Sequence, residues 1–291
     1  MGWLYIGIIL IFRGVQSQAS KGASGMLPGE VRGRTLYLVY YQGVVCLLAL
    51  VALLFSGGFA AIDGITAFLA TITGVFLTLS SLLSLLALKT GTLALGTFAS
   101  SAGLIIPAAA GIFLFDEPLS LWQWGGVALM LCSAFLLGSS SKEQKGTFSL
   151  KTVWILLGSM AANGAVMLCQ KYFAERVPDG SVSAYSFLTF LIPALALGIF
   201  LAVPSKQPLK PLDRRLYLYG GLLAVAVFVI NQLATLAASL VDSVVLFGFI
   251  NGGATVIAAV VGAAVYKEKL TVKSTVGILL GVVSMIVIKA L

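Results

Sequence analysis

A single arginine interrupts the first apolar stretch of the chain. It belongs to a set of polar residues with the spacing i, i+3, i+4, i+7 that one face of a helix displays: Arg13, Gln16, Ser17 and Ser20. A helix that begins at Gly2 and rises about 1.5 Å per residue places Arg13 roughly 16 Å along its axis, near the centre of a hydrocarbon core about 30 Å thick. The planar donors of a guanidinium suit a carboxylate or a phosphate, so this pattern predicts an anion-binding site.

Arg13 also has two structural interpretations. An unpaired arginine at that depth costs at least about 2.5 kcal/mol, so its guanidinium needs a cavity or a partner. Backbone carbonyls or amides, such as those of Asn231 or Asn251, could bind it, or its long side chain could reach the membrane interface. All acidic residues fall at the ends of apolar stretches or between them, so none lies at the depth of Arg13. Only an external anion would then neutralise its charge, and we favour that role.

Polar side chains recur in the other apolar stretches, where they cost free energy unless they face protein or a water-filled cavity. Close packing of small residues is the alternative explanation, and we favour it for Ser81, Ser101, Gly252, Gly253 and the Gly277/Gly281 pair. Amides are bulkier and carry more hydrogen-bonding groups, so we expect them to bind a ligand. The candidate substrate-binding residues are Arg13, Gln16, Ser17, Ser80, Ser84, Ser100, Asn163, Asn231, Gln232, Thr235 and Asn251.

The residue types that enzymes use most are scarce. The chain has no histidine, which removes the commonest general base and metal ligand. Its cysteines, Cys46, Cys132 and Cys169, stand singly inside apolar stretches, which argues against a disulfide framework or a thiolate metal site. We expect no catalytic residues, no cofactor and no metal site, and therefore no enzyme.

The elements that position these residues follow from composition. Of 291 residues, 59% are hydrophobic and 10% charged, which is typical of a polytopic helical membrane protein. We therefore predict an all-α membrane protein with ten transmembrane helices. Their ranges are Gly2 to Ala19, Leu36 to Phe55, Ile65 to Leu88, Thr92 to Phe115, Leu121 to Leu137, Val153 to Tyr172, Val182 to Val203, Leu216 to Leu240, Val244 to Tyr266 and Val272 to Ile288.

The chain repeats itself at an offset of 151 residues, which pairs Trp3 with Trp154, Gly7 with Gly158, Glu117 with Glu268 and Gly126 with Gly277. This predicts two five-helix units, residues 1–140 and 152–291. Five is an odd number, so the repeats have inverted topology, which places a substrate site between them and lets it alternate its exposure. Arg13 has Gly164 as its equivalent, and we expect this glycine to leave room opposite the arginine.

Two segments carry a family resemblance: "GLIIPAAAGIFLFDEPLSLWQWGGVALMLCSAFLL" and "GAAVYKEKLTVKSTVGILLGVVSMIVI". They resemble the paired hallmark of EamA-type members of the drug/metabolite transporter superfamily. The matching residues are Pro107, Glu117, Leu119 and Gly126 in the first half and Glu268, Leu270 and Gly277 in the second, whereas Ala258 replaces the second proline. The resemblance implies a ten-helix transporter.

Lysine and arginine lie mostly in the segments away from the two termini; Lys171, Arg176 and Lys289 fall on the terminal side. The positive-inside rule therefore predicts both termini outside the cytoplasm. The resemblance implies the reverse, because ten-helix relatives usually have both termini inside. We favour the charge distribution and expect an integral protein of a prokaryotic plasma (inner) membrane.

These observations predict a secondary active transporter of a small polar metabolite, anionic or zwitterionic, that works by alternating access. The alternative is a broad-specificity exporter of apolar or cationic compounds, which the aromatic residues would suit, among them Trp122, Trp124, Phe187 and Phe190. The expected partners are a small-molecule substrate and the lipid bilayer, with no nucleic acid, and a homodimer is left open.

Overall fold

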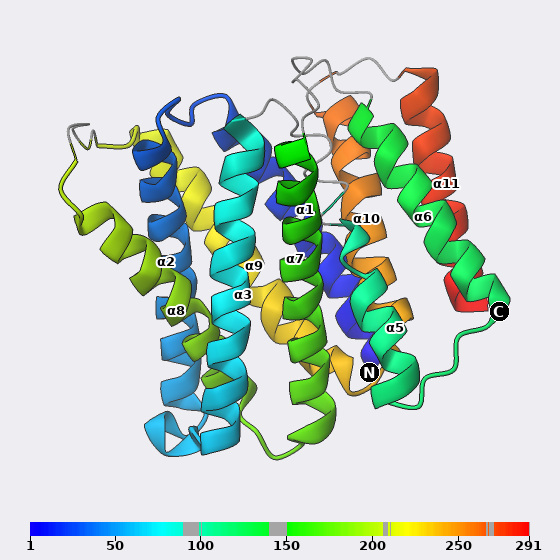
Figure 1. The fold of residues 1–291 in the computed structure, drawn as a ribbon, viewed down its shortest axis with the longest axis horizontal. Coiled ribbons are helices and arrows are strands. Elements are labelled where there is room, and N and C mark those ends of the chain that lie inside the picture. The colour runs from blue at the N-terminus through cyan, green and yellow to red at the C-terminus, as the bar shows by residue number, and fades with distance from the viewer. Residues whose placement is uncertain are drawn as a thin grey trace.

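The computed structural model describes residues 1–89, 99, 101–139, 150–205, 209, 211–265, 267 and 271–290. Within these ranges the chain forms α-helices and one short 3-10 helix, and no strand (Figure 1). The helices are α1 (Gly2–Ser24), α2 (Val31–Phe55), α3 (Gly64–Lys89), α5 (Ile105–Leu114), α6 (Leu121–Ser139), α7 (Leu150–Arg176), α8 (Val182–Ala202), α9 (Arg214–Ala238), α10 (Ser243–Ala264) and α11 (Val272–Ala290), and η1 spans Gly58–Ala61. The predicted all-α fold is confirmed.

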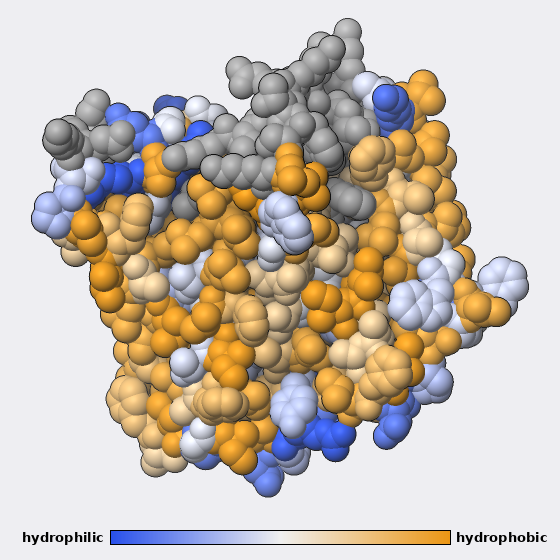
Figure 2. Space-filling view, viewed as in Figure 1, coloured by the Kyte–Doolittle hydropathy of each residue, from blue (hydrophilic) through white to orange (hydrophobic). Residues whose placement is uncertain are grey.

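Length and composition allow 7 of the described helices to cross a membrane: α2, α3, α7, α8, α9, α10 and α11. Helices α5 and α6 are apolar but shorter. Apolar residues cover the middle of the face in Figure 2, whereas hydrophilic residues gather toward its two ends. A soluble protein would not expose such a surface to water, so the chain is an integral membrane protein.

The helices run side by side, with the start of α1 and the end of α11 on the same side of the molecule (Figure 1). We call this the terminal side. Helix α6 packs mainly on α11, α1 on α9, and α2 on α8. Small residues allow these approaches, because a Cβ atom on Gly126 would lie 2.6 Å from Ile288 Cγ1 and one on Gly277 would lie 2.8 Å from Leu137 Cγ.

The predicted single helix Thr92 to Phe115 is wrong in its described part. Gly103 and Leu104 form a turn, and α5 begins only at Ile105. Pro107 has no backbone N–H to donate to the Gly103 carbonyl, and Ile106 N donates to that oxygen instead, at 3.1 Å. The proline therefore interrupts the helix one turn before its own position.

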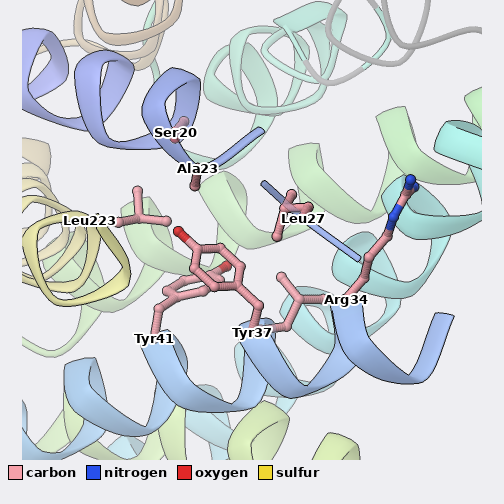
Figure 3. A pocket seen from close by; sticks show the side chains of 8 residues that line it. Ser20, Ala23, Leu27, Arg34, Tyr37, Tyr41 and Leu223 are labelled. Carbon is pink, nitrogen blue, oxygen red and sulfur yellow. The ribbon is translucent and has the colours of Figure 1, made fainter. Parts of the chain in front are cut away.

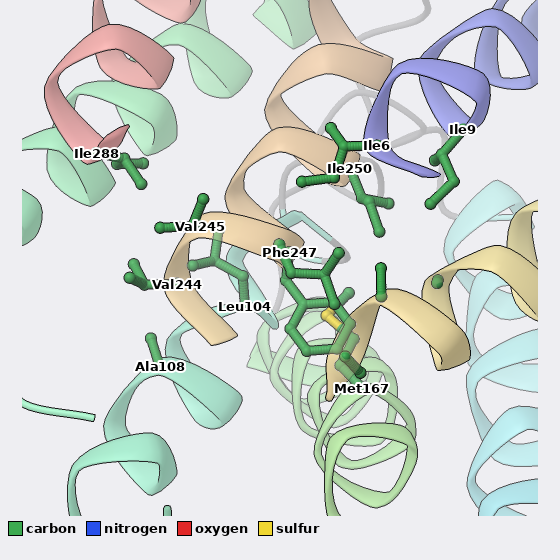
Figure 4. Close-up of a cluster of buried hydrophobic side chains, with 14 of the residues drawn as sticks. Ile6, Ile9, Leu104, Ala108, Met167, Val244, Val245, Phe247, Ile250 and Ile288 are labelled. Atoms are coloured by element: carbon green, nitrogen blue, oxygen red, sulfur yellow. The ribbon is translucent and has the colours of Figure 1, made fainter. Parts of the chain in front are cut away.

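A cluster of buried apolar side chains joins the two halves of the chain (Figure 4). Ile6 and Ile9 of α1 contribute to it together with Leu104, Met167 of α7 and Phe247 of α10. Ile9 and Leu104 are fully buried. This core packs α1, α7 and α10 together.

Candidate functional site

Arg13 lies midway along α1 and is partly buried. Its Nη1 donates a hydrogen bond to Gln16 Oε1 at 2.8 Å. Its Nε is buried and has no hydrogen-bond partner among the described residues. Within the same residues no carboxylate forms an ion pair with Arg13. The structure thus brings Arg13 and Gln16 together, and it gives neither Asn231 nor Asn251 as the partner of the guanidinium.

A second polar group joins α7, α8 and α9. Asn231 Nδ2 donates to Ser186 Oγ at 2.9 Å, and Ser186 Oγ donates to Gln232 Oε1 at 3.4 Å. Gln170 Nε2 donates to Thr235 Oγ1 at 2.7 Å and approaches Asn231 Oδ1 at 3.4 Å. We call Gln170, Ser186, Asn231, Gln232 and Thr235 the amide network. It brings the three candidates of α9 together.

Sequence reasoning missed two members of the amide network. Gln170 lies seven positions after Asn163 and therefore on the same helical face, a signal that could have found it. Ser186 gave no such signal, because a lone serine in an apolar helix is more often a packing residue.

The two polar groups lie at similar heights on adjacent helices. Helix α1 runs antiparallel to α9, since Gly2 meets Leu240 and Val241 while Gly22 meets Tyr219. Interpolation along the axes places Arg13 within about one helical turn of Asn231. No hydrogen bond joins the two groups in the part of the chain that the structure describes.

The remaining candidates are more dispersed. Asn251 Nδ2 lies 3.6 Å from Met167 Sδ, so α10 meets α7 there. Ser80 is buried in α3, whereas Asn163 in α7 and Ser17 in α1 are partly buried. Ser84 belongs to α3. Ser100 lies outside the described residues.

A pocket of about 220 Å³ opens at the side opposite the termini, between α1, α2 and α9 (Figure 3). Ser20, two turns after Arg13 on the same face, lines it with Tyr37 and Tyr41. Tyr37 is only 5% exposed, and its hydroxyl has no hydrogen-bond partner among the described residues. The Arg34 guanidinium points away from the tyrosines and donates from Nε to the Pro28 carbonyl at 2.8 Å. The pocket is mainly apolar, and the hydroxyls of Ser20, Tyr37 and Tyr41 are among its polar groups.

The terminal side holds a buried ionic network that sequence reasoning missed. Lys171 of α7 is 1% exposed and pairs with Glu117 at 2.7 Å and Glu175 at 2.8 Å. Its ammonium also donates to the Ala238 carbonyl at 2.6 Å. Glu117 does lie between two helices, as expected, yet it is only 10% exposed. Among the described residues, no group of three or more His, Cys, Asp or Glu could hold a metal ion.

Comparison with known proteins decides the family. The model of the EamA-like transporter family matches residues 150–290. The second half of the chain thus belongs to the EamA-like transporter family. Members of this family are membrane transporters of the drug/metabolite type and not enzymes, so the predicted membership is confirmed.

The likeness in fold extends over nearly the whole chain. A solved structure described as "Crystal structure of protein" superposes with a TM-score of 0.79 and covers 99% of this chain and 96% of its own. The two sequences are 15% identical, so the likeness shows the fold alone. No curated protein matches this EamA-like transporter.

Proposed function

We propose that this EamA-like transporter carries a small polar metabolite, anionic or zwitterionic, by alternating access between residues 1–140 and 152–291. The buried Nε of Arg13, which has no partner within the described residues, carries the proposal. Gln16 occupies one of the guanidinium donors and is uncharged, so it leaves the positive charge of Arg13 uncompensated. A carboxylate or phosphate would accept from the free donor and neutralise that charge.

The amide network would bind the polar remainder of the substrate. Asn231 lies within about one turn of Arg13 in height, on the adjacent helix. The side chains of Asn231 and Gln170 donate hydrogen bonds to hydroxyls of α8 and α9. Bonds to a ligand can replace these hydrogen bonds. The other candidates that belong to this proposal are Ser17, Ser80, Ser84, Ser100, Asn163 and Asn251.

The apolar pocket supports a second candidate function, export of apolar or cationic compounds with broad specificity. Leu27, Leu38 and Leu223 line it beside the two tyrosines, and they would suit an apolar compound. No carboxylate among the described residues lines this pocket, so a cation would find no opposite charge from them there. For this reason we place the anionic substrate first.

Counterflow in proteoliposomes tests the choice. Vesicles loaded with unlabelled compound receive tracer amounts of a labelled carboxylate, phosphate ester, zwitterionic amino acid or quaternary ammonium. Wild type should accumulate the carboxylate, the phosphate ester or the amino acid, or more than one of them. Arg13→Gln should lower that accumulation about tenfold or more, because a hydrogen bond to a charged group contributes about 1.5–3 kcal/mol. Arg32→Gln is the matched control, since Arg32 binds the backbone carbonyls of Leu201 and Val203 far from the proposed site.

Two further variants decide between the candidate functions. Arg13→Glu should lose anions and gain the quaternary ammonium, because the sign of the site is reversed. Accumulation of the ammonium alone by wild type would favour the broad-specificity exporter. Transport of anions by Arg13→Ala and Arg13→Glu at the wild-type rate would contradict the role of Arg13.

We also propose a prokaryotic plasma (inner) membrane as the location, with both termini outside the cytoplasm. Lys171 is buried in ion pairs, so it adds no surface charge on the terminal side. The opposite side carries exposed cations such as Arg214 and Arg215. Reporter fusions at both termini test this, and a cytoplasmic C-terminus would contradict it.

A further inference from the structure

Lys171 connects three segments at the terminal side. Besides its pairs with Glu117 and Glu175, its ammonium donates to the carbonyls of Ala238 at 2.6 Å and Val241 at 3.1 Å. Glu117 belongs to the turn between α5 and α6, Ala238 is the last residue of α9, and Val241 lies in the turn between α9 and α10. One buried cation thus holds the first half of the chain against the second.

Glu117 is held from the other direction as well. Its Oε2 accepts a hydrogen bond from Ser243 N at 2.8 Å, at the first turn of α10. A Cβ atom on Gly111 would lie 2.7 Å from the same oxygen, so α5 presses closely on the carboxylate. Both oxygens of Glu117 therefore bind the second half of the chain, one through Lys171 and one through α10.

An ionic contact suits a closure that must open again. A buried ion pair adds little stability compared with apolar residues of the same volume, so it is a poor choice for a permanent joint. When the partners part, however, water can hydrate each of them. Two acids, Glu117 and Glu175, pair with this single lysine. Burial, followed by the nearby charge of Glu117, raises the pKa of Asp242. Arg176, which could add a second cation, donates to the Leu114 carbonyl instead.

The equivalent of Lys171 on the opposite side of the molecule is not a charged residue. The offset of 151 residues pairs Lys171 with Ser20, a neutral residue that lines the open pocket. Glu268, the equivalent of Glu117, lies outside the described residues. Among the described residues, the buried Lys171 joins segments at the terminal side, whereas its equivalent on the opposite side, Ser20, is exposed.

We propose that Lys171, Glu117 and Glu175 form a gate that closes the transport path at the terminal side. The structure represents the state that is closed there and open toward Tyr37 at the other side. In the transport cycle the Lys171–Glu117 pair separates as α5–α6 moves away from α9–α10. This inference rests on the proposed alternating access, because a static protein would need no gate.

Thiol labelling tests the gate without any substrate. In a variant whose native cysteines are replaced by alanine, Ser243→Cys introduces a probe where the side chain is 1% exposed. The probe should react slowly with a membrane-impermeant maleimide added from the terminal side. Lys171→Gln should speed its labelling about tenfold or more, because removing one partner of a buried ion pair strongly destabilises the closed form. Lys289→Gln, a lysine on the same side that lies over the Trp3 ring, should leave the rate unchanged.

Other variants keep the test decisive if Lys171→Gln folds poorly. Glu175→Gln should have a smaller effect than Glu117→Gln, because Glu175 is 34% exposed and Glu117 only 10%. Equal labelling rates in wild type and in folded Lys171→Gln and Glu117→Gln would overturn the gate.

Reversible cross-linking distinguishes a gate, which must open during transport, from a contact that stays closed. Glu117→Cys with Ser243→Cys places one thiol in the turn between α5 and α6 and the other at the start of α10. A short bifunctional methanethiosulfonate would join the two thiols. Counterflow should stop in the cross-linked protein and return after reduction, whereas each single cysteine variant should be unaffected by the reagent. Full transport in the cross-linked protein would show a contact that stays closed. If no variant transports any tracer, the proposed function fails while the labelling result still decides the gate.

Discussion

Gly164 of α7 packs directly against Gly103, at the turn before α5: a Cβ atom on Gly164 would lie 2.5 Å from the Gly103 carbonyl oxygen. This carbonyl is the one that Pro107 leaves without its usual helical donor. In a membrane, an interrupted helix needs neighbours that cover its backbone. The glycine lets α7 come close enough to do so.

Gly164→Ala should therefore destabilise the protein by about 1–3 kcal/mol, because the added methyl group forces backbone apart rather than a flexible side chain. Thermal unfolding in detergent measures the effect as a lower midpoint. Gly43→Ala is the matched control, since a Cβ atom there meets nothing within 4 Å. Equal midpoints for Gly164→Ala and wild type would contradict the close approach.

Ser186→Ala should cost about 1–3 kcal/mol of stability, since it leaves the partly buried Asn231 Nδ2 without its acceptor. If the amide network binds substrate, the variant should also lower the apparent affinity in counterflow. Thr78→Val is the comparison, because Thr78 bonds only the Gly74 carbonyl of its own helix. The network would have no role in binding if both variants transported with wild-type affinity.

Tyr37→Phe should leave the free energy of unfolding unchanged, because the hydroxyl has no partner in the described part of the chain. Tyr185→Phe should cost about 0.5–1.5 kcal/mol, since its hydroxyl shares a 2.8 Å hydrogen bond with Thr73. Chemical denaturation in mixed micelles compares the two. A larger loss for Tyr37→Phe would mean that its hydroxyl is bound within the folded protein.

Asp63 should make stability depend on pH. It accepts from Thr66 N at 2.6 Å and Thr66 Oγ1 at 2.8 Å, and the backbone bond, followed by the hydroxyl, lowers the pKa of Asp63. A carboxyl with a lowered pKa stabilises the folded state above its unfolded pKa of about 4, and this stabilisation is lost as the pH falls through the folded value.

Asp63→Ala should consequently cost about 0.5–2 kcal/mol at pH 7 and less at low pH. Unfolding midpoints measured between pH 3 and pH 7 check this, as a difference between variant and wild type. Asp179→Ala, an exposed acid in another turn on the same side, is the control. The same pH profile in the two variants would contradict this role of Asp63.

Several features could be predicted from the sequence because they depend on local pattern. The length of the apolar stretches predicted the helices. The spacing of polar residues predicted that Arg13 lies beside Gln16, and Asn231 beside Thr235, on one helical face. The role of Gly164 was misjudged, since the glycine admits the backbone of the turn before α5 rather than leaving space opposite Arg13. The two five-helix repeats and the binding roles of the candidates stay predictions.

The network around Lys171 could not be predicted in the same way. Its members come from residues 117, 171, 175 and 238–243, so the contacts arise only when distant segments pack. Each acid alone looked like a charge at a helix end. Burial, which decides the energetics of the pair, is a property of the folded chain.

Equilibrium binding to purified protein tests the central claim, that Arg13 binds an anionic group. Thermal midpoints of wild type, Arg13→Lys and Arg13→Gln are measured against rising concentrations of the carboxylate, phosphate ester, amino acid and ammonium used in counterflow. Wild type should gain stability with at least one anion or zwitterion, Arg13→Lys should gain less, and Arg13→Gln should gain none. The same gain in Arg13→Gln as in wild type would contradict the account.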